Sequence, residues 1–135
     1  MPIINKVWIN GCFDVLHRGH IELFEYCNQI SGEYSYIKVG IDSDKRVKEL
    51  KGETRPINNQ DDRRYFLESI KFIDEVVVFD SEKQLINNIK KYSPEIMVVG
   101  SDYQNKRVIG SEYAKRLVFF DKVDGYSSTG ILEKI

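Results

Sequence analysis

The sequence predicts an α/β fold in which five parallel strands form one sheet and helices cover both of its faces. Short apolar runs alternate along the chain with segments whose apolar residues recur at helical spacing. This alternation is typical of β-α-β units. The apolar runs contain few polar residues, as expected for strands that are buried on both sides. We therefore expect residues 1–135 to form a single domain.

Each expected strand is a short run of apolar residues, many of them β-branched or aromatic. The five runs are residues 7–9, 36–41, 76–79, 96–99 and 117–120. Helices are expected between them. They are residues 17–29, residues 62–69, a segment marked by Leu85, Ile86 and Ile89, and residues 128–135. Ser31 and Gly32 end the first helix, and Pro94 stops the third.

The composition excludes several classes of partner. The 20 basic and 21 acidic side chains give a net charge of −1, so no overall charge attracts nucleic acid or an anionic membrane. The N-terminus lacks the features of a secretory signal, and no apolar run approaches the ~20 residues of a membrane span. Cys12 and Cys27 are too few for a disulfide framework and have no zinc-type spacing. We therefore expect a cytoplasmic protein without a dedicated metal site.

A candidate anion site follows the first strand. In parallel sheets, ligands bind at the carboxyl ends of the strands. Three segments lie there: residues 10–20, 42–46 and 100–107. His17 and His20 share one face of a helix start, with Gly19 between them, and a helix N-terminus favours phosphate. Stray histidines are more often surface residues or helix-end hydrogen bonders. These two are the only histidines in the chain, and together they favour a phosphate clamp.

Residues 11–20 resemble the signature of the cytidylyltransferase-like nucleotidyltransferases, a superfamily with a Rossmann-like parallel sheet and a His-x-Gly-His motif at its first helix. The matching residues are Gly11-Cys12-Phe13-Asp14 and His17-Arg18-Gly19-His20. The resemblance extends from Trp8 to Ile135, because residues 51–57, 100–103 and 126–131 follow in the same order. These details resemble most the adenylyltransferase domain of the bacterial heptose-phosphate enzymes. Residues 63–78 also resemble glycerol-3-phosphate cytidylyltransferase.

The resemblance implies roles for individual residues. It assigns catalysis to His17, His20, Lys51 and Arg63. It assigns nucleotide binding to Gly11, Cys12, Phe13, Asp14, Gly19, Asp102, Tyr103, Ser127, Ser128 and Thr129. Polar loop residues that suit hydroxyls and phosphates are expected to bind the acceptor: Asp42, Asp44, Arg55 and Lys122.

Structural alternatives exist for several of these residues. Asp14 could hold its loop through backbone hydrogen bonds, and residues 51–56 could be a solvated loop. Arg63 could be a surface charge near a helix start, although the helix dipole does not favour a cation there, so phosphate is a sensible partner. Residues 126–129 also suit a helix cap.

Two departures from the family pattern leave the nucleotide open. Ser128 stands where the family's Ser-Thr-Thr triplet has Thr, and it keeps the hydroxyl. Cytidylyltransferases often carry Arg-Thr-Glu-Gly before the triplet, whereas residues 122–125 read Lys-Val-Asp-Gly. Lys cannot make the bidentate grip of Arg on phosphate. Both ATP and CTP therefore stay as candidates.

The resemblance implies a transfer of a nucleoside monophosphate to a phosphorylated acceptor. The acceptor phosphate is already anionic near neutral pH, so no strong general base is needed, and Mg²⁺ should bridge triphosphate oxygens. A sugar or polyol phosphate is favoured over choline phosphate, since the loops offer no aromatic cage for a quaternary ammonium. The leading pair is a heptose phosphate with ATP, and glycerol 3-phosphate with CTP is the alternative.

Other classes of function were weighed against a transferase. A nucleotide-binding module without catalysis is disfavoured by the presence of His17, His20, Lys51 and Arg63 together. A redox domain that uses NAD is disfavoured because the first loop lacks Gly-x-Gly-x-x-Gly.

A homodimer is expected, because residues 70–78 resemble a segment that packs across a two-fold axis in related enzymes, and a short chain has a limited core.

Overall fold

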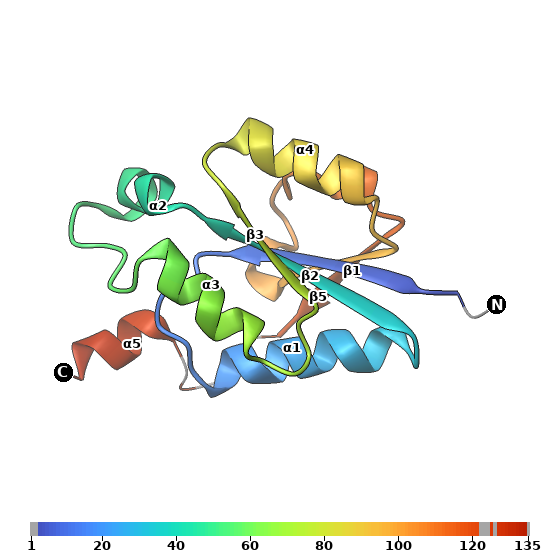
Figure 1. Cartoon of the computed structure of the whole chain (residues 1–135), viewed down its shortest axis with the longest axis horizontal. Coiled ribbons are helices and arrows are strands. Elements are labelled where there is room, and N and C mark those ends of the chain that lie inside the picture. The colour runs from blue at the N-terminus through green and yellow to red at the C-terminus, as the bar shows by residue number, and fades with distance from the viewer. Residues whose placement is uncertain (1–2, 122–124, 126, 135) are drawn as a thin grey trace.

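The computed structural model describes residues 3–121, 125 and 127–134. Its centre is a five-stranded sheet with the strand order β3-β2-β1-β4-β5, in which every pairing is parallel (Figure 1). The strands are β1 (Asn5–Gly11), β2 (Ser35–Asp42), β3 (Glu75–Phe79), β4 (Ile96–Gly100) and β5 (Arg116–Phe120). The fold class predicted from the sequence is therefore confirmed.

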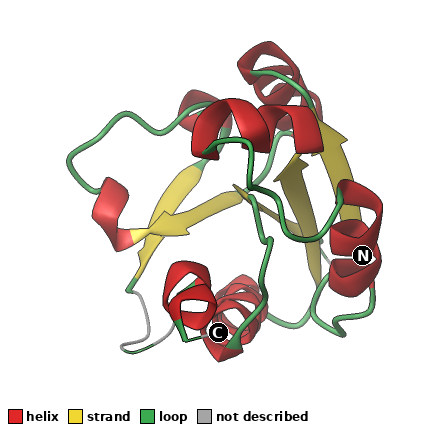
Figure 2. Ribbon diagram, turned by 90° about the vertical axis from the view of Figure 1, so that its left-hand side faces the viewer, coloured by secondary structure: helices red, strands yellow, loops and turns green. Residues whose placement is uncertain are grey.

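Helices lie on both faces of the sheet (Figure 2). They are α1 (Arg18–Ser31), α2 (Asp44–Lys51), α3 (Gln60–Glu68), α4 (Glu82–Tyr92) and α5 (Ser128–Glu133), with single 3₁₀ turns η1 (Ser101–Tyr103) and η2 (Ser111–Tyr113). Helices α1 and α3 pack on one face, whereas α4 packs on the other (Figure 1). No helix of the described residues is long and apolar enough to cross a membrane.

Alternate residues of β1 build the two cores. Val7 and Ile9 pack with Phe24 of α1 and Leu67 of α3. Trp8, between them in sequence, belongs to the other core with Phe79, Leu85, Ile89 and Met97. Successive side chains of a strand point to opposite faces of the sheet, and in this central strand both faces are buried in a core. This explains why the strand sequences are apolar throughout.

Gly40 of β2 makes room for the Trp8 indole. A Cβ atom at residue 40 would lie 2.6 Å from Trp8 Cζ2, closer than real Cβ atoms approach other atoms. Trp8 itself is completely buried. The indole is therefore held tightly between β2 and the residues of α4.

Four helices begin at side chains that cap their backbone N–H groups, and one of them is α5, capped by Ser127. The oxygen of Ser43 accepts from Arg46 N, that of Asn59 from Asp62 N and that of Ser81 from Gln84 N. Such caps satisfy donors that a helix start leaves unpaired. They also explain why α3 begins at Gln60, two residues before the predicted start at residue 62.

Helix α2 was not predicted from the sequence. Residues 42–46 were expected only as a segment that follows a strand, but α2 begins at Asp44 and continues to Lys51. Val47 is its only buried residue, so the helix has almost no apolar face to reveal it. Because α2 is present, Lys51 is the last residue of a helix and does not lie in an extended loop.

Strand β1 is the point at which the topology changes direction. It pairs with β2 on one side and with β4 on the other, so the loops after β1 and β4 diverge at the carboxyl edge. A crevice opens at such a switch point and is the usual ligand site of open α/β sheets.

Candidate active site

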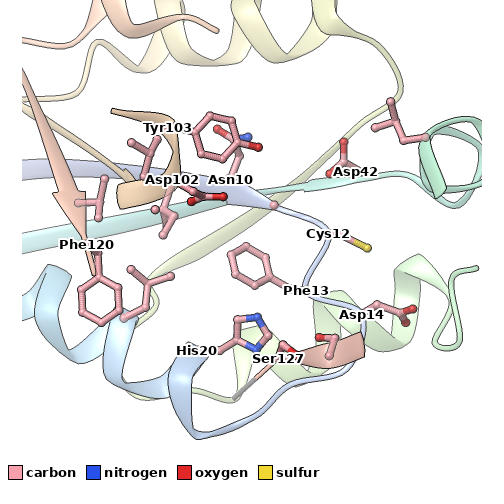
Figure 3. Close-up of a pocket in the computed structure, with 18 of the residues that line it drawn as sticks. Asn10, Cys12, Phe13, Asp14, His20, Asp42, Asp102, Tyr103, Phe120 and Ser127 are labelled. Atoms are coloured by element: carbon pink, nitrogen blue, oxygen red, sulfur yellow. The ribbon is translucent and has the colours of Figure 1, made fainter. Parts of the chain in front are cut away.

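A cavity of about 600 Å³ lies at this switch point (Figure 3). Its wall includes residues from all three segments that the sequence predicted to meet: residues 10–20, 42–46 and 100–107. Parts of α2, β5 and the start of α5 complete the lining. The predicted residues on its wall are Gly11, Cys12, Phe13, Asp14, His17, Gly19, His20, Asp42, Lys51, Arg55, Asp102, Tyr103, Ser127 and Ser128.

The two histidines form a stacked pair at the start of α1. His17 is the N-cap residue, and His20 lies in the first turn. Their ring centroids are 3.8 Å apart with an interplanar angle of 26°. The backbone N–H of His17 donates to His20 Nδ1 at 3.2 Å. Because Nδ1 accepts, the proton of the neutral ring is on Nε2, which is left as a donor.

Burial makes both imidazoles hard to protonate. The pKa of His20 is lowered to about 4 by burial, by His17 and by Lys51. Burial also lowers the pKa of His17. Both rings are therefore neutral hydrogen-bond donors near pH 7, while Lys51 supplies positive charge to the same cavity. A phosphate bound beside the rings would raise both pKa values again.

The lowered pKa of His20 predicts an acid-sensitive stability. Its ordinary pKa is 6.5 and its folded pKa is about 4, so the unfolded chain binds more protons between these values. The contribution of His20 to stability is present above pH 6.5 and is lost as the pH falls toward 4. We expect the free energy of unfolding to fall by roughly 2 kcal/mol between about pH 7 and pH 5. Urea titrations should show a smaller fall in His20→Gln; an equal fall in both chains would contradict the assignment.

Phe13 supports the histidine pair from the loop between β1 and α1. Its φ of 49° lies in the left-handed region, which is unusual for a residue with a large side chain. This conformation sends the ring into the core, edge-on to His20 with the ring centroids 5.3 Å apart. The side chain is buried, so the backbone of Phe13 is the part that a phosphate would meet.

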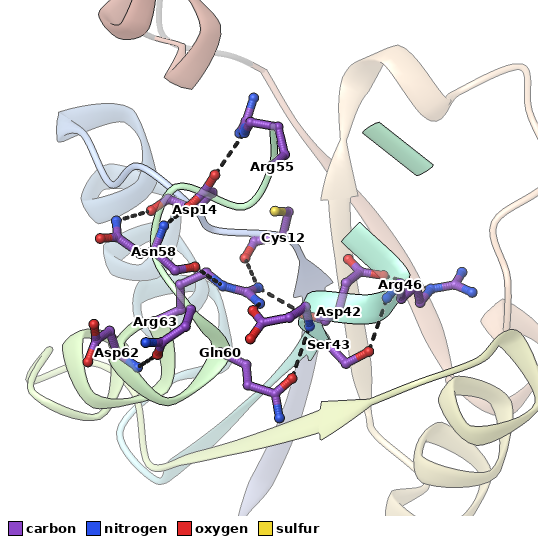
Figure 4. Close-up of polar contacts among 12 residues, drawn as sticks. Cys12, Asp14, Asp42, Ser43, Arg46, Arg55, Asn58, Gln60, Asp62 and Arg63 are labelled. Atoms are coloured by element: carbon purple, nitrogen blue, oxygen red, sulfur yellow. Dashed lines mark hydrogen bonds and ion pairs between the residues drawn. The ribbon is translucent and has the colours of Figure 1, made fainter. Parts of the chain in front are cut away.

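Asp14 joins this loop to residues 55–58. Its carboxylate accepts from the backbone N–H groups of Ile57 and Asn58 and from Arg55 Nε, each at 2.8 Å (Figure 4). Burial opposes ionisation of Asp14, but the hydrogen bonds from Asn58, Ile57 and Arg55 outweigh it and lower the pKa. Asp14 is only 2% exposed, and its carboxylate holds the loop in place through these hydrogen bonds. This geometry matches the structural alternative stated for Asp14.

Arg63 lies beneath the cavity and not on its wall. The residue is 0% exposed. Nη1 donates to the carbonyls of Cys12 at 2.9 Å and Asp42 at 2.8 Å. Nε donates to Asn58 O at 3.0 Å and Nη2 to Asp44 Oδ1 at 2.9 Å (Figure 4). The guanidinium therefore ties together the ends of β1 and β2 and the loop before α3.

The geometry of Arg63 and Asp44 favours roles other than the catalytic and acceptor-binding roles predicted from the sequence. Neither residue is part of the cavity wall formed by the described residues. The guanidinium is enclosed by protein oxygens, and the carboxylate of Asp44 is its ion-pair partner. Arg63 is therefore a positioning residue, and Asp44 contacts Arg63 where an acceptor had been expected.

Two cations on the cavity wall were not singled out from the sequence. Arg46 pairs with Asp42 Oδ1 at 2.7 Å and lies 5.6 Å from the Phe79 ring centroid. Arg107 comes from the segment after η1 and is largely exposed. Both belong to segments that the sequence had marked as strand-end loops. With Lys51 and Arg55 they place four basic residues on the wall, beside the carboxylates of Asp14, Asp42 and Asp102.

The start of α5 closes the cavity near the histidines. Ser127 Oγ accepts from Gly130 N at 2.8 Å, and Ser128 Oγ donates to Val15 O at 2.6 Å. The second bond anchors α5 to the loop before α1. Thr129 is the second residue of α5, and Lys122 lies outside the described residues. The cap expected for residues 127–129 is present, next to the predicted phosphate site.

Asp102 and Tyr103 form η1 directly after β4 and line the cavity. A Cβ at residue 100 would lie 2.6 Å from Asp102 Oδ1, so Gly100 allows this carboxylate to fold back over the strand end. Among the described residues, no group of three or more His, Cys, Asp or Glu side chains is arranged to hold a metal ion.

Comparisons with known proteins identify the family of the chain. The family model described as cytidylyltransferase-like matches residues 8–133. The bifunctional protein HldE of Campylobacter fetus subsp. fetus (strain 82-40) is 46% identical over 129 residues, which are 96% of this chain and 27% of HldE. HldE of Helicobacter pylori (strain P12) is 43% identical, with the same coverage of 96% and 27%. The chain thus spans roughly a quarter of the length of these relatives.

A solved structure supports the fold independently. The lipopolysaccharide core biosynthesis protein from Thermoplasma volcanium GSS1 has a TM-score of 0.70 and 20% identity, over 89% of this chain and 98% of that chain. A sequence identity of 20% supports the similarity of fold and says nothing about function. The family match covers nearly the whole chain and includes the loop with both histidines. The chain therefore belongs to the cytidylyltransferase-like family and is a nucleotidyltransferase.

Proposed function

We propose that the chain transfers AMP from ATP to the phosphate of a heptose phosphate and releases pyrophosphate. The observation that carries the proposal is one cavity whose wall includes two neutral histidines at a helix start and four basic side chains. Its volume of about 600 Å³ lies in the range of small-molecule sites. The choice of acceptor and nucleotide is supported by the motif details of residues 51–57, 100–103 and 126–131, and by the similarity to HldE.

The nucleotide phosphates are proposed to lie at the start of α1. Backbone N–H groups of a helix start and of the preceding loop attract anions. His17 and His20 add side-chain donors, and Ser127 and Ser128 line the cavity at the start of α5. Arg55 stays beside them because Asp14 holds its guanidinium.

In the reaction, an oxygen of the acceptor phosphate attacks the α-phosphorus in line, and the bond to the β-phosphate oxygen breaks. Pyrophosphate leaves with the electron pair of that bond. The attacking oxygen is already anionic, so no proton has to be removed. His20 Nε2–H stabilises charge that grows on the leaving side, and Lys51 reduces the repulsion between the two anions. Mg²⁺, bound by the triphosphate, would supply further charge neutralisation.

A second candidate is the transfer of CMP to glycerol 3-phosphate. It is favoured by the resemblance of residues 63–78 to glycerol-3-phosphate cytidylyltransferase. This candidate uses the same phosphate site and the same chemistry. It differs only in the nucleobase and in the size of the acceptor.

The proposal predicts a pattern in a pyrophosphate-release assay. ATP, CTP, GTP and UTP would each be combined with heptose 1-phosphate, glycerol 3-phosphate and choline phosphate in the presence of Mg²⁺. We expect ATP with heptose 1-phosphate to turn over fastest and EDTA to abolish release. Preference for CTP with glycerol 3-phosphate would replace the proposal by the second candidate. Tight ATP binding with no release from any pair would indicate a binding module instead.

We also propose that the chain forms a homodimer through the surface of α3 and through residues 70–78, which follow it. Tyr65 and Phe66 of α3 are 69% and 45% exposed, which is unusual for adjacent large aromatic residues in a monomer. We expect light scattering at micromolar concentration to give the dimer mass, and Phe66→Glu to give the monomer mass. Tyr34→Glu, at a similarly exposed tyrosine in the loop between α1 and β2, is the matched control. A wild-type monomer would refute this proposal.

A further inference from the structure

We propose that Asn10 determines specificity for the acceptor by donating a hydrogen bond to one of its hydroxyl oxygens, and that the buried Trp8 indole fixes the direction of this donor. The inference rests on the proposed function, because it assigns the acceptor side of the same cavity. Asn10 is the penultimate residue of the central strand and lines the cavity, two residues after Trp8 on the same face of β1.

The contact between the two side chains determines how the amide is turned. Trp8 Nε1 donates to Asn10 Oδ1 at 2.9 Å. An indole N–H is a donor only, so its partner must be the oxygen of the amide and not the nitrogen. The NH₂ group of Asn10 therefore faces away from Trp8. Among the described residues, none accepts a hydrogen bond from this group.

The indole cannot turn to release the amide. Trp8 is 0% exposed, and its six-membered ring fills the space that the absent side chain of Gly40 leaves. Phe79 packs in the same core, and the ring of Tyr92 lies 6.2 Å from the indole, centroid to centroid. Because the rigid indole fixes the amide of Asn10, the NH₂ group loses little conformational freedom when a ligand binds.

The position of Asn10 separates it from the expected triphosphate site. Figure 3 shows Asn10 on one side of the strand ends with Asp102 and Tyr103, two residues that the family resemblance assigns to the nucleotide. Phe13, His20 and Ser127 lie on the other side. Pyrophosphate would leave toward the histidines. In-line displacement requires the attacking phosphate to approach from the opposite side of the α-phosphorus, which is the side of Asn10.

The surroundings of Asn10 suit a polyhydroxylated acceptor. This part of the wall combines the amide with the ion pair of Asp42 and Arg46, and with the aliphatic side chains of Leu85 and Ile109. Hydroxyl groups need donors and acceptors of this kind, and the C–H faces of a sugar can pack on aliphatic residues. Because the amide of Asn10 is neutral, it would bind a hydroxyl group of the acceptor, while the basic side chains of the cavity bind the acceptor phosphate.

Two variants at residue 10 test the proposal with heptose 1-phosphate and ATP as probes. Asn10→Ala removes the donor, and we expect the KM for heptose 1-phosphate to rise roughly tenfold with the KM for ATP unchanged. Asn10→Asp has nearly the same shape and still accepts from Trp8, but it presents a negative acceptor in place of the donor. We expect a rise on the order of a hundredfold in that variant. Asn87→Ala, at an exposed asparagine of α4, is the matched control and should match wild type.

Trp8→Phe tests the positioning role. It keeps an aromatic ring but removes the indole N–H, so the amide of Asn10 is free to turn. We expect the KM for heptose 1-phosphate to rise by several-fold with little change in the KM for ATP. The same KM as wild type would show that the indole does not set the direction of the amide.

Three results would overturn the assignment, and they are distinguishable. Unchanged kinetics in Asn10→Ala and Asn10→Asp, with an active wild type, would refute this inference and leave the proposed function intact. A rise in the KM for ATP that equals or exceeds the rise for the acceptor would show that Asn10 contacts the nucleotide. A wild-type chain that releases no pyrophosphate with any pair would refute the proposed function and this inference together.

Discussion

Arg63→Ala is expected to lower the free energy of unfolding by about 3–5 kcal/mol, because it leaves the half-buried carboxylate of Asp44 and three carbonyls without their donor. The carbonyls belong to Cys12, Asp42 and Asn58. A loss of this size is a large share of the stability of a small domain. Denaturant unfolding followed by circular dichroism measures it directly.

Two further variants make the Arg63 prediction specific. Arg63→Lys keeps the charge but not the planar fork that reaches several oxygens at once, so we expect a substantial but smaller loss. Arg64→Ala is the neighbouring control, since Arg64 is half exposed and its Nε is 3.6 Å from Glu68 Oε1. Its effect should lie within about 0.5 kcal/mol of wild type. Similar stability of Arg63→Ala and Arg64→Ala would refute the positioning role.

His17→Ala and His20→Ala are each expected to lower kcat on the order of 10²–10³-fold. Both side chains line the cavity at the start of α1, where charge grows during phosphoryl transfer. Single-turnover kinetics with saturating substrates measure the chemical step. His20→Gln, which keeps an N–H donor, should recover part of the loss. Near-wild-type kcat in both alanine variants, with the fold intact, would remove the histidines from the mechanism.

Much of the fold could be predicted because burial leaves a clear pattern. The inner strands β1, β2 and β4 are buried on both faces, so they contain apolar runs such as residues 96–99. Helix α4 is equally visible because Leu85 and Ile89 point into a core. Helix α2 buries only Val47, and its one usable signal was Ser43, whose side chain caps it.

The site was predictable to the extent that it depends on strand ends. The loops after β1, β2 and β4 converge because parallel strands end at one edge of the sheet, and the histidine motif marked the centre of that edge. The role of Arg63 was not predictable, because its partners Cys12 and Asp42 are 51 and 21 residues away in sequence. Only the folded chain shows that protein carbonyls, and not a ligand, surround this guanidinium.

Asn10 shows a similar limit. Its place after a strand was visible, but the orientation of an amide depends on its neighbour. The hydrogen bond from Trp8 depends on Gly40 making room for the indole, and no local pattern in the sequence connects these residues.

Phosphorus NMR of the protein mixed with ATP, Mg²⁺ and heptose 1-phosphate tests the central claim most directly. We predict that the heptose 1-phosphate signal is replaced by the two coupled signals of a sugar-linked diphosphate, with one equivalent of free pyrophosphate. The same mixture with His20→Ala should show this conversion only at a greatly reduced rate. Release of inorganic phosphate with ADP, or of AMP with no new diphosphate, would contradict the proposed transfer.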